Sequence, residues 1–323
     1  MCKIHILCLW LICLLFCSCL DSHVQVTVFP ETKQLLAEKV FVEEIFAADF
    51  VEKAGDNFVI SSTKTDTTLF LYATPTLKFK SATGLKGEGP NEVKMFPMFC
   101  HTLDEDFLYI RGYEPYSIRK IKLQEDGSFS FVGMYHLDGG EYNFMNVIKD
   151  SLLVYYEGNH LTVTKYDLKN KVKLGEIKKE TDSHNESYYY SNRGLISAND
   201  SFVVYPYIYK KQIDIYRVDD FNLVKRISDG NKYPAPSIRD AKNITCHYFN
   251  VYAGSKYFYA LYVGHKADEN FSDRTLEVYD YDGNPIVKYT FDIIPHYFAV
   301  DEKEGYIYAT NSNYEDYLLR YKL

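Results

Sequence analysis

Two histidines are the residues of this chain whose type and spacing best fit binding chemistry. His247 and His296 each lie ten residues before an aromatic residue that begins a strand-like segment, Tyr257 and Tyr306. Imidazole nitrogens bind metals and hydrogen-bond polar ligands, so equivalent positions in neighbouring repeats predict two rings that face a common ligand. The alternative is that each ring points sideways into a packed core, because strand side chains alternate between two faces.

Charged residues ahead of predicted strands form the second candidate set for ligand binding. Arg193 lies in the segment 191–194 (SNRG), and Arg239 and Asp240 end the segment 236–240 (PSIRD). A guanidinium group binds carboxylates and sugar hydroxyls through its fixed donors. Solvated loop charge without a binding role is the alternative.

No catalytic arrangement stands out in the sequence. It contains no nucleophile elbow, no HExxH pair and no P-loop. The paired acids Asp104/Asp106 and Asp219/Asp220 fall beside turn signals, where aspartate is common for turn chemistry alone. Two histidines without a located carboxylate are a weak metal site. We therefore expect no catalytic residue, no metal site and no cofactor.

A sixfold repeat positions these candidates. Each copy has a polar turn, a short strand of aromatic and β-branched residues, a polar gap and a second strand. The first large residue of each copy lies at Phe58, Phe107, Leu152, Phe202, Tyr257 and Tyr306, so the spacings are 49, 45, 50, 55 and 49 residues. Such periods are typical of propeller blades. The sequence predicts an all-β fold, a six-bladed β-propeller with four-stranded antiparallel blades, whose innermost strands carry His101, His247 and His296.

The two ends of the chain predict how the ring closes. The sixth copy stops at Leu323 after its third strand, and the run 39–46 (KVFVEEIF) precedes the first copy. We expect 39–46 to pair beside 317–323 as the missing outer strand, because such pairing removes an exposed sheet edge. The expected division is a lipoprotein signal peptide at 1–18, an acylated cysteine and linker at 19–38, and the propeller at 39–323.

The first residues are similar to an export signal with a lipoprotein cleavage site. Lys3 precedes an apolar run over 4–16, which has the length of a signal-peptide core rather than of a membrane span. The motif FCSC at 16–19 resembles a bacterial lipobox, which implies cleavage before Cys19 and its acylation. An ordinary secretory signal or a simple anchor is the alternative. We expect Cys19 to hold the protein to a lipid bilayer, at the outer membrane and facing the periplasm, because only one acid, Asp21, follows closely.

Composition indicates a folded, acidic, β-rich chain. Hydrophobic residues make up 46% and charged residues 25%, which suffices to bury a core, and the 31 tyrosines favour strands. The net charge of −8 argues against a nucleic-acid partner, which needs a basic surface. After residue 19 the only cysteines are Cys100 and Cys246. An exported location permits a disulfide between them but predicts no framework.

One glycine-rich run suggests a family. The segment 84–93 (GLKGEGPNEV), followed by Pro97, resembles the inter-blade turn of NHL-type propellers. A phosphate-binding loop is disfavoured, because Pro90 and strand signals stand where such a loop needs a helix. Together with the lipobox and six repeats, the chain resembles the TolB-like or NHL-like six-bladed propeller lipoproteins of Bacteroidetes. The resemblance implies a fold and a location, and no single activity.

Three functions fit these features. The leading hypothesis is a membrane-anchored, non-enzymatic propeller that binds an envelope protein or a small ligand at one face of the ring. The alternative is a lactonase-like or glycan-lyase-like enzyme that brings histidines and acids of the channel together. A purely structural element of an envelope complex would have a filled, featureless channel.

Overall fold

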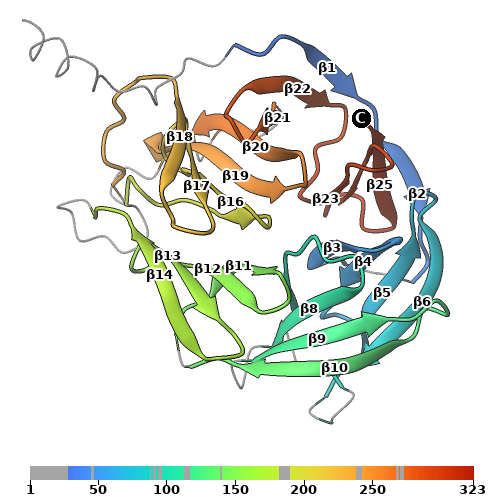
Figure 1. Cartoon of the computed structure of the whole chain (residues 1–323). Coiled ribbons are helices and arrows are strands. Elements are labelled where there is room, and N and C mark those ends of the chain that lie inside the picture. Colours follow the sequence, from blue (N-terminus) through green and yellow to red (C-terminus); the bar gives the residue numbers. More distant parts are fainter. Residues whose placement is uncertain are drawn as a thin grey trace, which may run out of the picture.

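Six β-sheets are arranged radially around a central axis in the computed structural model (Figure 1). The structure describes residues 28–323 except 45–46, 88, 90–91, 94–96, 113–116, 139, 182–189, 238–241, 267–268 and 270–272. Each sheet has four antiparallel strands, and one sheet gains a fifth, parallel strand. The predicted fold class, an all-β six-bladed β-propeller, is confirmed.

The first three blades follow one another along the chain, each from its innermost to its outermost strand. Blade 1 consists of β3 (Phe50–Ala54), β4 (Asn57–Ser61), β5 (Thr67–Ala73) and β6 (Lys78–Leu85). Blade 2 consists of β7 (Met98–Cys100), β8 (Phe107–Gly112), β9 (Ser117–Leu123) and β10 (Phe129–His136). Blade 3 consists of β11 (Asn143–Ile148), β12 (Leu152–Glu157), β13 (Thr162–Asp167) and β14 (Val172–Lys178).

The other three blades continue in the same order. Blade 4 consists of β15 (Ser197–Ala198), β16 (Phe202–Pro206), β17 (Gln212–Arg217) and β18 (Leu223–Ser228). Blade 5 consists of β19 (Thr245–Ala253), β20 (Tyr257–Lys266), β21 (Thr275–Asp280) and β22 (Pro285–Phe291). Blade 6 takes β23 (Tyr297–Asp301), β24 (Tyr306–Thr310) and β25 (Tyr317–Lys322) from the end of the chain. The six first strands lie beside one another in ring order, so they surround the axis.

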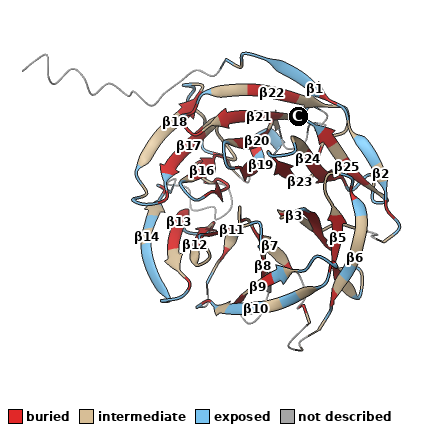
Figure 2. Ribbon diagram, turned by 45° about the vertical axis from the view of Figure 1, so that its right-hand side comes forward, coloured by how far each residue is buried: buried red, intermediate tan, exposed pale blue. Residues whose placement is uncertain are grey.

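The core lies between the blades, on their second and third strands. All residues of β4 are buried, and β14 on the outside of blade 3 is mostly exposed, as Figure 2 shows. The largest fully buried side chains include seven tyrosines: Tyr72, Tyr109, Tyr156, Tyr205, Tyr279, Tyr308 and Tyr321. Packing between blades therefore accounts for much of the tyrosine content, because flat rings fill the space between neighbouring sheets.

The ring closes with a strand from the beginning of the chain, as predicted. Strand β2 (Glu38–Phe41) pairs antiparallel with β25 and becomes the outermost strand of blade 6. Beyond the strand, the Val42 amide donates to the Asp316 carbonyl over 3.0 Å. The pairing ends earlier than the expected 39–46, of which 45–46 lie outside the described residues.

A second strand of the N-terminal segment was not expected. Strand β1 (Thr32–Leu35) lies parallel to β22 and extends blade 5 on its outer edge. The propeller therefore includes part of the segment 19–38, which the sequence assigns to a linker. Because β1 joins blade 5 and β2 joins blade 6, the segment fastens two neighbouring blades along the outer rim (Figure 1).

The glycine-rich run lies between blades, as the sequence indicates. Lys86 forms a parallel bridge to Val93, and the Gly87 amide donates to the Val93 carbonyl over 3.1 Å, so the chain forms a loop between β6 and β7 and continues in its original direction. The cysteines Cys100, in blade 2, and Cys246, in blade 5, are both free thiols. No helix in the described part of the chain has the length and apolarity to cross a membrane.

Candidate functional site

One end of the axis is occupied by the side chain of His101, directly after β7. Its Nδ1 lies 3.2 Å from the Glu52 carboxylate on β3, and its Nε2 lies 2.9 Å from the Ala253 carbonyl at the end of β19. Blades 2 and 5 are opposite each other in a ring of six, so the imidazole connects the two sides. The ring also meets Tyr252 edge-on, with centroids 4.6 Å apart. This group of residues forms the floor of the axis.

The floor is an ion pair rather than a neutral contact. Both nitrogens of His101 face acceptors, a carboxylate and a carbonyl, so both must carry a proton to be paired. Burial lowers the pKa of His101, but the charge and hydrogen bond of Glu52 and the Ala253 carbonyl outweigh it, so the pKa is raised. An imidazolium beside a buried carboxylate is the consistent state.

Buried side chains continue the floor from blade to blade. Asn146 of blade 3 accepts a hydrogen bond from the Ala198 amide of blade 4 over 2.8 Å. Ser197 of blade 4 accepts one from the Ala253 amide of blade 5 over 2.9 Å. The inner strands are therefore held together by specific bonds at this level, which makes the floor rigid.

Toward the other end of the innermost strands, large aromatic side chains meet solvent. Phe144 on β11 is 46% exposed, Phe249 on β19 is 53% exposed and Tyr297 at the start of β23 is 41% exposed. The ring of Tyr297 lies 6.0 Å from that of Phe50 on β3. We call these four residues, which occupy corresponding positions on the innermost strands of blades 1, 3, 5 and 6, the aromatic mouth.

Strand bulges account for two of these exposed rings. The pairing of β11 with β12 shifts between Asn143 and Asn146, and the pairing of β19 with β20 shifts around Phe249. Phe144 also has a positive φ of 46°, which is costly for a bulky side chain. A bulge turns a side chain out of the regular alternation, and bulges are common next to functional sites.

His247, two residues before Phe249, is enclosed by side chains between blades 4 and 5, and we call this enclosure its pocket. Its amide donates to the Ile208 carbonyl over 2.6 Å, and its ring meets Tyr233 at 4.8 Å and Tyr262 at 5.9 Å between centroids. The residue is only 5% exposed, yet neither ring nitrogen has a hydrogen-bond partner among the residues that the structure describes. Burial lowers the pKa of His247 to about 4, so the ring is neutral at pH 7.

Two opposite charges complete this pocket. The Lys211 ammonium lies 4.8 Å above the Tyr262 ring and 4.0 Å from the buried Glu277 carboxylate. Asp229 accepts a hydrogen bond from the Tyr233 hydroxyl. We call Lys211, Asp229, Tyr233, His247 and Tyr262 the His247 pocket.

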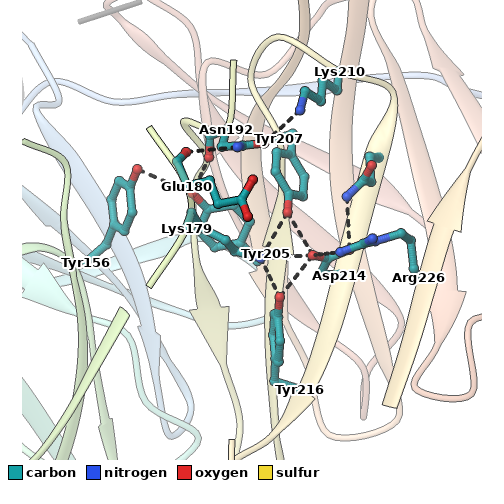
Figure 3. A network of polar contacts seen from close by, with 11 residues as sticks. Tyr156, Lys179, Glu180, Asn192, Tyr205, Tyr207, Lys210, Asp214, Tyr216 and Arg226 are labelled. Atoms are coloured by element: carbon teal, nitrogen blue, oxygen red, sulfur yellow. Dashed lines mark hydrogen bonds and ion pairs between the residues drawn. The ribbon is translucent and has the colours of Figure 1, made fainter. Parts of the chain in front are cut away.

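A related polar network in blade 4 is built around a buried carboxylate, that of Asp214. Asp214 on β17 is fully buried and binds the Lys179 ammonium at 2.8 Å and Arg226 at 2.8 and 3.0 Å (Figure 3). The hydroxyls of Tyr207 and Tyr216 donate to the same carboxylate over 2.8 and 2.9 Å. Burial raises the pKa of Asp214, but its cations hold it well below the usual range. The Asp214 carboxylate is out of contact with solvent, although Arg226 is 38% exposed, and the network joins blades 3 and 4.

Blade 5 carries the same network in altered form. Glu277 lies across from Lys288 in the register that Asp214 and Arg226 share in blade 4. Lys179 directly follows the outer strand of blade 3, but the residue that directly follows the outer strand of blade 4 is an aspartate, Asp229. Lys211, from the turn before β17, approaches Glu277 instead, and Glu277 Oε1 accepts no hydrogen bond from any described residue. The position after the outer strand therefore holds the Lys179 ammonium in the blade 4 network and the Asp229 carboxylate near His247.

The structure connects one predicted residue to His247. The Arg193 carbonyl accepts from the Ile208 amide over 2.9 Å, and the Ile208 carbonyl accepts from His247. Arg193 therefore lies on a segment adjacent to the His247 pocket. Three other predicted residues, Cys19, Arg239 and Asp240, lie outside the described residues.

His296 lies in different surroundings from His247. Its Nδ1 is 3.1 Å from the Ser312 hydroxyl, in a pocket that Ala48 and Asn311 also line. Burial and the Arg274 charge lower its pKa. The two histidines share no described neighbour, although their offsets within the repeat are identical. The described part of the chain also contains no group of three metal-ligating side chains.

Sequence reasoning did not identify most of the His247 pocket. Lys211 and Asp229 fall in turns between strands, and Tyr233 and Tyr262 are two of 31 tyrosines. One signal was present: an alignment of strand ends places Asp229 where the preceding blade has Lys179. Such a change of charge between repeats marks a position where the two blades differ in role.

Comparison with known proteins adds evidence on the fold only. No family model matches the sequence, and no curated protein matches it significantly. Among solved structures, a protein of Bacteroides fragilis NCTC 9343 that is described as exported matches with a TM-score of 0.58 and 12% identity. The match covers 90% of this chain and 98% of that one. The structure of U3-55K matches with a TM-score of 0.54 and 6% identity, over 89% and 98%. At such low identity these likenesses show the propeller architecture alone.

Proposed function

We propose that this protein is an exported, lipid-anchored propeller that binds a small ligand at the aromatic mouth. The observation that carries the proposal is the exposure of Phe144, Phe249 and Tyr297 on innermost strands, beyond a floor held by His101. An aromatic ring buries a large apolar area when it is covered, so rings left open on the inner strands favour a ligand. Exposed apolar surface of this kind is characteristic of interaction sites.

The beginning of the sequence supports the export and anchoring part of the proposal. The apolar run at 4–16 and the lipobox-like FCSC at 16–19 fit a lipoprotein signal that leaves Cys19 acylated. Strand β1 lies on the outer rim of blade 5, away from the inner strands (Figure 1). A lipid attached upstream of β1 would therefore leave the aromatic mouth free for its ligand.

A binding function is favoured over the enzyme alternative by the separation of the two histidines. A lactonase-like or lyase-like mechanism needs a general base, an acid and the substrate within hydrogen-bond reach of one point. His247 is enclosed by tyrosines of blades 4 and 5, and His296 contacts Ser312 of blade 6. Each histidine would have to act without the other.

A thermal-shift screen of the purified protein tests the proposal. The panel holds glycans, small organic acids, divalent metals and short peptides, because a ligand that binds only the folded state raises the melting temperature. We expect at least one small molecule to raise it, and the rise to vanish in Phe249→Ala and Tyr297→Ala. Leu174→Ala is the matched control, since Leu174 is 51% exposed on the outer strand β14. A rise that survives both mouth variants would contradict the proposed site.

A further inference from the structure

We propose that the His247 pocket is the subsite that selects a neutral carbohydrate, whose hydroxyl groups bind the two unpartnered nitrogens of His247. The inference rests on the proposed function, since it names the ligand class for the same end of the ring. It starts from an unusual observation, a histidine that is 5% exposed and whose two ring nitrogens have no hydrogen-bond partner in the described part of the chain. Buried polar groups are nearly always hydrogen-bonded, so an exception needs an explanation.

The hydrogen-bond inventory of His247 selects the ligand class. A neutral imidazole presents one donor and one acceptor. A carboxylate or phosphate offers only acceptors and leaves the acceptor nitrogen unpaired, whereas an ammonium offers only donors and leaves the N–H unpaired. Hydroxyl groups both donate and accept. Two neighbouring hydroxyls, or one hydroxyl and a ring oxygen, therefore match the imidazole at both nitrogens.

The charges around the pocket point to the same class. Lys211 and Lys288 carry positive charge, and Asp229 and Glu277 carry negative charge, so the surroundings balance. A balanced pocket gives no net attraction to an ion that must lose its hydration shell, and desolvation of a charge is costly. A metal ion lacks ligands here, because the described residues contain no group of three donors.

The two tyrosines supply the apolar part of a sugar site. Tyr233 and Tyr262 are half-buried, and the rings of both contact the imidazole. A pyranose has C–H faces that pack on flat rings and hydroxyls at its edge, so it satisfies both the rings and His247. Because His247 is covered, the ring of Tyr233 must turn aside for a ligand to enter. The Asp229 carboxylate, which accepts a hydrogen bond from the Tyr233 hydroxyl, can then accept one from a sugar hydroxyl.

Calorimetric titration with sugars matched in shape and different in charge tests the inference. The probes are the methyl glycosides of galactose, galacturonate and galactosamine, and the corresponding glucose, glucuronate and glucosamine set, all up to millimolar concentration. We expect a neutral member to bind, and its acid and amine counterparts to bind about tenfold more weakly or worse, because each brings a charge that must lose its hydration shell among groups whose charges already balance. Tighter binding of an acid or an amine overturns the inference, as does the failure of every neutral sugar to bind.

Variants of His247 separate this inference from the proposed function. His247→Phe keeps the ring and removes both nitrogens, so we expect a loss of about tenfold or more in affinity for the neutral sugar. His247→Gln restores a donor and an acceptor and should bind within a few-fold of the wild type. His160→Phe, at an exposed turn of blade 3, is the control. If His247→Phe binds like the wild type while Phe249→Ala does not, the His247 nitrogens do not bind the sugar, and only the present inference fails.

Discussion

Replacing His247 should remove a defined part of the pH dependence of stability. Burial lowers the pKa of this histidine to about 4 from an ordinary 6.5. In this range the unfolded chain binds a proton that the folded chain rejects, so folding stability falls as the pH drops below 6.5. Between pH 7 and pH 5 the loss from this one group is roughly 2 kcal/mol, and below pH 4 it levels off at about 3 kcal/mol.

Urea denaturation of the wild type and two variants at pH 7 and pH 5 measures the contribution of His247 to the pH dependence of the free energy of unfolding. His247→Phe and His247→Gln cannot titrate, so each should lose about 2 kcal/mol less than the wild type on acidification. Comparing variants with the wild type cancels His101 and His296, whose pKa values are shifted in opposite directions. If both variants show the full wild-type pH dependence, His247 is not held neutral by burial, and the description of its pocket is wrong.

Three further outcomes follow from the floor, the blade 4 network and the ring closure. His101→Phe should destabilise the protein by about 3–5 kcal/mol in urea denaturation, because it leaves Glu52 buried without its cation; a cost below about 1 kcal/mol would contradict a buried ion pair between His101 and Glu52. Lys179→Met should cost a similar amount by leaving Asp214 with one cation fewer, whereas the exposed Lys173→Met serves as a control with little effect. Deleting 28–41 removes β1 and β2 and should lower the midpoint temperature of the ring's single calorimetric unfolding transition by more than about 10 °C. A separate transition of blade 6 alone at lower temperature would contradict closure of the whole ring.

The blades could be predicted from the sequence because their signals are local. Five of the six aligned positions, from Phe107 to Tyr306, are the first residues of the second strand in their blades, and Phe58 is the second residue of β4. A turn residue followed by a short continuous run of apolar residues indicates such a strand without reference to the rest of the chain. The closing strand was predictable for a related reason, since an incomplete sixth copy leaves an unpaired edge.

The features that depend on contacts across the ring could not be predicted. Only Leu35 of β1 is buried, so the strand has no apolar alternation that would indicate its pairing with blade 5. The bond from His101 to Ala253 joins residues 152 positions apart and exists only once the ring has closed. His247 and His296 have equal offsets in the repeat, but β19 has nine residues and two shifts of register, which separate their environments.

The measurement that tests the account most directly is the affinity of the best-stabilising small molecule for wild type, Phe249→Ala and Leu174→Ala, measured by calorimetric titration. Phe249 and Leu174 are equally exposed, but one lies on an innermost strand and the other on an outer strand. The account predicts at least about tenfold weaker binding for Phe249→Ala, as expected for loss of a covered aromatic contact, and unchanged binding for Leu174→Ala. Equal affinity in all three proteins would contradict a ligand site at the aromatic mouth.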